Sequence, residues 1–287
     1  MNEITILSGK GGTGKTTITA ALTAVAENTV FTDCDVDAAD LHLIFEPETK
    51  EEHRFESGWE VLIDQDSCTR CGICKDLCRF EAIHYKESGG FEINPYQCEG
   101  CRLCERACPV QAITSKALDN NFWYVSDTRF GTMVHARMGA GEENSGRLVT
   151  KVRDRAKEIA REQQAENMIN DGPPGIGCPV ISSLSKVPKV LMVIEPTHSG
   201  LHDTRRLIEL VRQFNASLYA LINKYDLNEE FTGKIEKMLE ENDIPLVGKI
   251  PFDETFVNAM VQKQTITEYR PESPVAGIIR KVWEKIR

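Results

Sequence analysis

The chain has little that would suit a nucleic-acid-binding or membrane protein. Its formal net charge is −10, and phosphate contacts need clustered Lys and Arg, so non-specific DNA binding is not expected. The same charge disfavours docking on an anionic membrane surface. No stretch approaches about 18 consecutive apolar residues, so no stable membrane insertion is predicted. The first residues, MNEITILSG, lack a basic segment followed by an apolar run, so we expect no signal peptide and a cytoplasmic protein.

The cysteine content needs an explanation other than disulfide bonds. The chain has ten cysteines, and in a reducing compartment cysteines are more often metal ligands. With 41% hydrophobic and 27% charged residues, the composition is ordinary for a globular protein. A length of 287 residues is long for one domain and short for three.

A glycine-rich loop with the sequence GKGGTGKT lies at residues 9–16. A strand is predicted over 5–7 and a helix over 16–26, which is the context of a phosphate-binding loop. The glycines let backbone N–H groups close around phosphates, and the helix N-terminus adds partial positive charge. Lys15 is expected at the β- and γ-phosphates and Thr16 at Mg²⁺. The predicted nucleotide ligands are Gly11, Gly12, Thr13, Gly14, Lys15, Thr16 and Thr17.

Eight of the cysteines form two runs with one spacing, Cys-x2-Cys-x2-Cys-x3-Cys. This pattern is typical of ferredoxins with two [4Fe–4S] clusters, in which the fourth cysteine of each run binds the other cluster. Zinc is the alternative, but zinc sites rarely use eight cysteines in such a repeat. The cluster 1 set is therefore Cys68, Cys71, Cys74 and Cys108, and the cluster 2 set is Cys98, Cys101, Cys104 and Cys78.

The two runs differ at one position that bears on cluster 2. The second run ends in Cys108-Pro109, whereas the first ends in Cys78-Arg79. Proline usually shapes the chain at this point. A cation in its place is expected to shift the potential of the cluster that Cys78 binds, because net charge tunes that potential.

Strands alternate with helices around the cysteine-rich segment. Apolar runs at 29–32, 189–194 and 218–222 suit parallel strands buried on both faces, and 122–125 and 132–136 suit a hairpin. Helices are predicted over 146–163, 200–214, 229–241, 253–263 and 274–286. The predicted fold class is α/β, a doubly wound and mostly parallel sheet of a P-loop ATPase with an inserted small α+β ferredoxin-like domain. The ATPase domain is predicted at 1–59 and 116–287, and the inserted domain at 60–115.

The last predicted helix, at 274–286, has an apolar stripe beside Arg280, Lys281 and Lys285. A basic amphipathic helix of this kind could lie on a membrane surface. We favour packing on the sheet, because such stripes are usual for surface helices.

The glycine-rich loop and four later segments together resemble the MinD/ParA-type (SIMIBI) P-loop ATPases, which have a deviant Walker A loop. The segments are TDCD at 32–35, INDGPPG at 169–175, the pair Asn223-Lys224, and IPFD at 250–253. In that family the first loop lysine reaches the phosphates of a dimer partner, which implies a nucleotide-dependent homodimer and a role in trans for Lys10. The resemblance implies that Lys10, Lys15 and Asp35 are catalytic, with Asp35 orienting the attacking water. It also implies a Mg²⁺ site at Thr16, Asp33 and Asp171, and an adenine site at Asn223, Lys224 and Pro251.

Taken whole, the chain resembles members of this superfamily that carry an inserted ferredoxin domain, which implies Mg²⁺-dependent ATP hydrolysis to ADP linked to iron–sulfur clusters. Three functions stay open at this point. The favoured one is assembly or delivery of a cluster or metallocofactor to a client protein, and the other two are alternatives. Another is ATP-gated electron transfer to a redox partner, as in nitrogenase iron proteins, and the third is a nucleotide-switched spatial or regulatory role. The acidic charge weakens the third.

Two cysteines outside the runs bear on the choice between the first two functions. Cys34 and Cys178 could form a labile metal site, which favours assembly, whereas two complete cysteine sets favour electron transfer. Cys178 follows Asp171 at the offset where nitrogenase iron proteins place a bridging ligand, but residues 134–145 hold no second cysteine. Cys178 is therefore a tentative ligand, and a buried structural cysteine is the favoured interpretation.

Overall fold

The computed structural model describes residues 1–56, 58–118, 120–139 and 146–287. These residues form two compact units. Unit 1 holds Met1–His53, Trp123–Arg137 and residues 146–287, and unit 2 holds Arg54–Phe122 with residues 138–139. The insertion predicted at 60–115 lies inside unit 2. Residues 57, 119 and 140–145, which the predicted division assigns to one domain or the other, lie outside the described residues.

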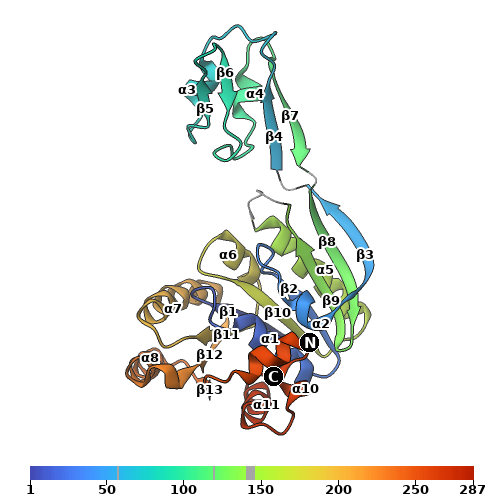
Figure 1. Ribbon diagram of the computed structural model, residues 1–287, viewed down its shortest axis with the longest axis vertical. Helices are drawn as coiled ribbons and strands as arrows, with labels where there is room; N and C mark the ends of the chain where they lie inside the picture. The colour runs from blue at the N-terminus through green and yellow to red at the C-terminus, as the bar shows by residue number, and fades with distance from the viewer. Residues whose placement is uncertain (57, 119, 140–145) are drawn as a thin grey trace. The chain divides into compact units, whose positions relative to one another are not determined.

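Unit 1 is built on a nine-stranded sheet with the order β13-β12-β11-β1-β10-β2-β9-β8-β3 (Figure 1). From β13 to β9 every neighbouring pair is parallel. The strands β8 and β9 are joined by two residues and lie next to each other, as the predicted hairpin requires. The predicted fold class is confirmed. The strand bounds are β1 Asn2–Ser8, β2 Thr29–Asp33, β3 Glu48–Phe55, β8 Asn121–Thr128, β9 Gly131–Arg137, β10 Asn167–Pro174, β11 Lys189–Ile194, β12 Ser217–Asn223 and β13 Leu246–Ile250.

Helices pack against the sheet and form two hydrophobic clusters with its strands. One cluster joins strand side chains to α1 (Lys15–Val25), α2 (Leu41–Phe45), α10 (Ile266–Tyr269) and α11 (Pro274–Ile286). The other joins them to α6 (Cys178–Leu184), α7 (His198–Val211) and α8 (Glu229–Glu241), and Figure 1 shows α7 and α8 beside β11 to β13. The central strands are buried because both faces are covered, which explains their continuous apolar runs. The remaining elements of unit 1 are α5 Arg147–Glu162, α9 Thr255–Val261 and the short helices η1 Arg212–Phe214 and η2 Tyr225–Leu227.

The apolar stripe of α11 faces the protein interior. Val275, Ile279, Val282 and Ile286 are buried in the first hydrophobic cluster. Packing of this helix on the sheet, the favoured interpretation, is therefore confirmed. Among the described residues, no helix combines the length and apolar character needed to cross a membrane.

Unit 2 repeats one small pattern twice. Each cysteine run contains a short helix, α3 or α4, and is followed by a strand, β5 or β7. The strands pair antiparallel as β4 with β7 and β5 with β6. Its core consists of Val61, Cys74, Ile83, Phe91 and Ile113. A core this small gives limited stability by itself, and metal ligation commonly supplements such domains. The bounds are β4 Gly58–Ile63, α3 Ile73–Leu77, β5 Ile83–Tyr85, β6 Phe91–Ile93, α4 Leu103–Ala107 and β7 Ile113–Leu118.

Candidate functional site

The glycine-rich loop connects β1 to α1 and is supported by the end of β12. Gly12 and Gly14 have left-handed φ angles of 78° and 88°, which glycine adopts without steric cost. A Cβ at Gly14 would lie 2.5 Å from Nδ2 of Asn223, and this nitrogen donates to the carbonyl of Thr13 over 2.8 Å. The Thr13 hydroxyl is buried and has no hydrogen-bond partner among the described residues. A phosphate oxygen bound in this loop would be a suitable partner for this hydroxyl.

Lys15 is buried among carboxylates at the start of α1. Its Nζ lies 3.0 Å from Oδ1 of Asp171 and 3.5 Å from Oδ2 of Asp35. Burial by itself would lower the pKa of Lys15, but the carboxylates of Asp171, Asp35 and Asp33 together raise it. Lys15 is therefore charged and neutralises this acidic group in the observed conformation.

Asp171 in β10 is the centre of this group. Its Oδ2 accepts a hydrogen bond from the Thr16 hydroxyl over 2.7 Å, and its Oδ1 accepts one from Thr19, also over 2.7 Å. The strands β1, β10 and β2 are neighbours in the sheet, so their carboxyl ends bring the loop, Asp171 and Asp33 to one edge. Lys15, Thr16, Asp35 and Asp171, predicted from separate segments, therefore lie together.

Asp33 shapes the segment that leads from β2 to α2. Its Oδ1 accepts the N–H of Asp35 and its Oδ2 accepts the N–H of Leu41, both over 3.1 Å. Burial and the nearby Asp171 raise the pKa of Asp33 well above its ordinary value, against the effect of Lys15. Burial also raises the pKa of Asp35, to about 6, although Lys15 opposes this. Both Asp33 oxygens bind backbone in this conformation, and its role at Mg²⁺ stays a prediction.

Lys10 is held within its own chain by a residue that the motifs did not indicate. Its Nζ lies 2.7 Å from Oε2 of Glu195 and donates to the Thr197 hydroxyl over 3.1 Å. The other oxygen of Glu195 binds Nζ of Lys224 over 2.9 Å, and Lys224 also donates to the carbonyl of Gly12 over 3.2 Å. Burial would raise the pKa of Glu195, but the two lysines lower it. One carboxylate thus fixes two of the three lysines assigned to nucleotide, Lys10 and Lys224.

The position of Glu195 in the sequence gives the signal that could have identified it. It directly follows the buried strand β11, at the same edge of the sheet as the glycine-rich loop. Polar residues at the carboxyl ends of parallel strands are the usual place for ligand contacts. Thr19 gives no such signal, because a threonine inside a helix is ordinary.

A mostly apolar cavity beside the loop contains the predicted base-binding residues. Asn223, Lys224 and Pro251 line it together. Thr17 also lines this cavity, and its hydroxyl contacts Sδ of Met260 over 3.6 Å. An apolar pocket with a few polar groups is the usual form of a small-molecule site, and the adenine contacts stay a prediction. The other lining residues are Gly14, Ile18, Phe252, Asp253, Phe256, Val257 and Met260.

The cysteines of unit 2 line two cavities in the predicted combination. The first, called the cluster 1 cavity, is lined by Cys68, Cys71, Cys74 and Cys108. The second, the cluster 2 cavity, is lined by Cys78, Cys98, Cys101 and Cys104, and Cys74 lines both cavities. Each fourth cysteine therefore lies with the other run, as two cubanes require. Among the described residues, no three His, Cys, Asp or Glu side chains are placed to hold a single metal ion.

The two remaining cysteines differ sharply in exposure. Cys34 is fully buried, where burial raises the pKa of its thiol to about 12, so it is a poor thiolate ligand. Cys178 is exposed at the start of α6. The buried interpretation of Cys178 is therefore wrong. A labile site made by Cys34 and Cys178 is likewise disfavoured, because the first of the two thiols lies in the sheet core.

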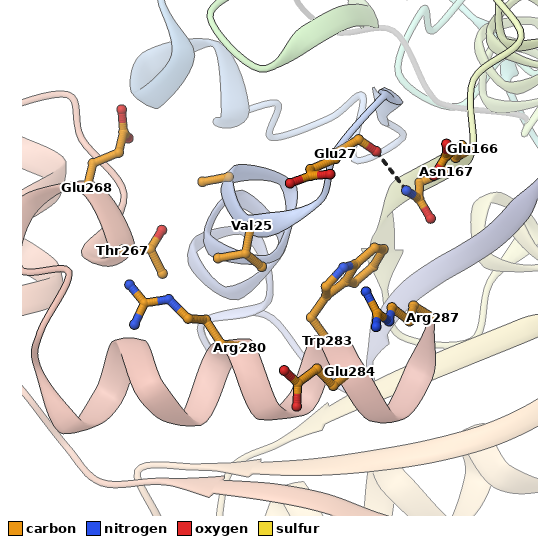
Figure 2. Close-up of a pocket in the computed structure, with 11 residues that line it drawn as sticks. Val25, Glu27, Glu166, Asn167, Thr267, Glu268, Arg280, Trp283, Glu284 and Arg287 are labelled. Atoms are coloured by element: carbon orange, nitrogen blue, oxygen red, sulfur yellow. Dashed lines mark hydrogen bonds between the residues drawn. The ribbon is translucent and has the colours of Figure 1, made fainter.

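A further cavity, of about 510 Å³, lies where α1 ends. Figure 2 shows Trp283 and Arg280 of α11 facing the end of α1, and the Asn167 side chain donating to the carbonyl of Glu27 over 2.7 Å. Acidic and basic side chains line it, among them Glu166, Glu268, Glu284 and Arg287. No predicted functional residue lies here, so the nucleotide and cluster sites remain the candidates.

Comparison with known proteins identifies the family. Residues 4–266 match the CobQ/CobB/MinD/ParA nucleotide binding domain. Because this match covers most of the chain, the protein belongs to that family, and unit 1 is a nucleotide-binding domain with the MinD fold. An uncharacterised protein of Methanocaldococcus jannaschii is 34% identical over 99% of this chain and 96% of its own length. A ferredoxin of Pyrobaculum islandicum is 35% identical over 77 residues, which are 25% of this chain and 68% of that protein.

The solved structures agree with this fold. The septum site-determining protein MinD of Pyrococcus horikoshii, complexed with Mg-ADP, has a TM-score of 0.60 at 19% identity, with 99% of this chain and 95% of that chain covered. At this identity the similarity concerns the fold alone. The chain is therefore a MinD/ParA-like nucleotide-binding protein with a ferredoxin-like, cysteine-rich region.

Proposed function

We propose that the protein is a Mg²⁺-dependent ATPase that dimerises on binding ATP and controls electron transfer through two [4Fe–4S] clusters. The observation that carries this proposal is the grouping of the cysteines into two complete four-thiol sets. Cubanes with four cysteine ligands are suited to carry electrons without leaving the protein. The nucleotide part rests on family membership and on the loop geometry.

The ion pairs of Lys15 with Asp35 and Asp171 support a conformational switch that responds to nucleotide. Lys15 is the cation that neutralises Asp171 and Asp35 in the observed conformation. When nucleotide binds, Lys15 is expected to move to the phosphates, and Mg²⁺ would then take its place beside Thr16 and Asp171. The segments that carry Asp35 and Asp171 would respond to this exchange, because each loses an ion pair with Lys15. Asp35 is then placed to orient the attacking water.

Electron transfer is favoured over cluster delivery by the state of Cys34. Delivery needs a site that releases its metal, and Cys34 and Cys178 were the thiols available for one. Cys34 is buried and its thiol pKa is raised to about 12. The eight cysteines other than Cys34 and Cys178 all belong to the two complete four-thiol sets.

Delivery remains a second candidate because Cys178 is exposed. A two-thiolate site across a dimer would need one such cysteine from each chain. Cys178→Ala tests it directly by iron content and by spectra recorded with and without ATP. Delivery through this site is excluded if neither quantity differs from the parent.

The two functions are separated by following electrons and iron in one experiment. The reconstituted protein is reduced anaerobically and mixed with oxidised cytochrome c, or with an apo-ferredoxin, with and without Mg-ATP. Electron transfer predicts cytochrome reduction that depends on ATP while iron stays with the protein. Iron transfer to the apo-ferredoxin would support delivery instead. Lys15→Ala is the matched control, because it keeps both cysteine sets and removes the phosphate contact.

A further inference from the structure

The two cluster cavities are related by the internal repeat, but their charges differ. The cluster 1 cavity is lined by no charged residue. The cluster 2 cavity is lined by Arg79, Arg102 and Arg106, with Glu99 as the acid among its lining residues. This accumulation of arginine stands out in a chain whose net charge is −10.

All three arginines occur where the repeat has another residue. The runs are offset by 30 positions, so Arg102 corresponds to Gly72 and Arg106 to Asp76. Arg79 corresponds to Pro109 in the same way. A duplicated unit needs none of these cations to hold a cluster, because the cluster 1 cavity is built without them.

Arg102 is retained at a conformational cost. It has a left-handed φ angle of 62°, where its repeat counterpart Gly72 has 82°. A residue with a Cβ is sterically strained in this conformation, whereas glycine is not. Its guanidinium lies 4.0 Å from the centre of the Trp59 ring, and its Nε donates to Glu105 over 2.6 Å.

Exposed apolar side chains surround the arginines. Leu77, Phe80 and Leu103 line the same cavity and are 40%, 45% and 44% exposed. Arginine among exposed apolar and aromatic residues is the composition typical of a protein interface. Charge complementarity then requires an acidic partner surface.

We propose that these residues form a docking face for a redox protein that presents carboxylates around its own redox centre. The cluster 2 face is defined here as Arg79, Arg102 and Arg106 with Leu77, Phe80 and Leu103. The inference rests on the proposed electron-transfer function. In this step cluster 2 of the reduced protein would lose one electron. The partner's redox centre, a one-electron acceptor, would gain it. The two clusters thereby have unequal roles, with electrons leaving at the arginine-lined one.

Small charged oxidants test this face without knowledge of the partner. The reconstituted full chain is reduced and mixed by stopped flow with ferric EDTA, an anion, or with hexaamminecobalt(III), a cation, over a range of ionic strength. The field of a chain with net charge −10 would repel the anion, so added salt would speed its reaction. A local arginine face attracts the anion instead, so salt should slow it.

Two variants and one control isolate the arginines. Arg106→Asp adopts the residue of the other repeat, and Arg79→Gln removes one charge. Lys116→Asp in β7 makes the same charge change as Arg106→Asp at an exposed position that lines neither cavity. At low salt, oxidation of Arg106→Asp by ferric EDTA should slow on the order of 10-fold. Arg79→Gln should slow less, and Lys116→Asp should match the parent.

The outcomes separate this inference from the proposed function. Clusters in the parent that cannot be reversibly reduced would refute electron transfer itself. Reversible clusters with equal oxidation rates in Arg106→Asp and Lys116→Asp would refute only the docking face. Arg106-dependent co-sedimentation with anionic phospholipid vesicles, without an effect on oxidation, would assign the face to a membrane and also refute the proposal.

Discussion

Replacing Glu195 by glutamine should release Lys10 and strengthen the nucleotide-dependent dimer. In the observed conformation the Glu195 carboxylate holds Lys10 at 2.7 Å and Lys224 at 2.9 Å. If Lys10 acts on the phosphates of a partner, this pair must break in each chain before the dimer is complete. Glu195 would then set the threshold for dimerisation.

The size of the effect follows from the usual strength of such a bond and from the exposure of the pair. Hydrogen bonds to charged groups contribute about 1.5–3 kcal/mol, and solvent screening lowers this, because the side chains of Lys10 and Glu195 are 26% and 16% exposed. We take about 1–2 kcal/mol per chain, or about 2–4 kcal/mol for a dimer that releases two lysines. The dimer Kd of Glu195→Gln with Mg-ATP should therefore fall roughly 30- to 700-fold.

Analytical ultracentrifugation across a concentration series measures this Kd. The control is the same substitution in a Lys10→Ala background, where no lysine remains to be released, so Glu195→Gln should then have little effect. An equal change in both backgrounds would show that Glu195 acts by another route. An unchanged Kd in the Lys10-containing chain would refute the reasoning.

Three further predictions use the same sites. Lys15→Ala removes the cation that neutralises Asp171 and Asp35, so nucleotide binding should be lost and the free energy of unfolding should fall by about 3 kcal/mol. Fluorescent-nucleotide titration and urea denaturation measure these two quantities, and unchanged values in both would contradict the assigned role of Lys15. Anaerobic reconstitution should give about eight irons and eight sulfides per chain, and four irons or fewer in the parent would contradict two clusters. EPR should show that Cys71→Ser and Cys101→Ser each damage a different cluster. Burial lowers the pKa of His135 to about 4, so the folded state binds fewer protons than the unfolded state, and its stabilising contribution is complete above pH 6.5 and is lost as pH falls towards 4. At pH 5 the free energy of unfolding should have fallen by about 1–2 kcal/mol relative to His135→Gln, and parallel pH profiles of the two proteins would exclude this.

Much of the fold could be predicted because the pattern of apolar side chains carries the signal. The strand at 189–194 and the helices at 229–241 and 274–286 occur with the predicted bounds, since long apolar runs and strong periodicity specify them. The edge strand β3 was not predicted. Its residues are mostly exposed and charged, so it depends on pairing with β8 and not on an apolar pattern.

The candidate sites could also be predicted only in part. Motif spacing predicted which cysteines share a cavity, because the repeat fixes how each run wraps one cluster. Burial could not be predicted for Cys178, which was expected inside and is exposed. The position of Glu195 after an apolar strand marks it as a candidate ligand contact, but its pairing with two lysines could not be predicted. Those lysines approach it from the glycine-rich loop and from the end of β12, which only the sheet order places together.

The central claim, that nucleotide controls the clusters, is tested most directly by redox titration monitored by EPR. Midpoint potentials of both clusters are measured in the reconstituted protein with and without saturating Mg-ATP. The account predicts that at least one midpoint shifts with Mg-ATP in the parent and that neither shifts in Lys15→Ala. Identical midpoints with and without nucleotide, in a protein that binds and hydrolyses ATP, would contradict it.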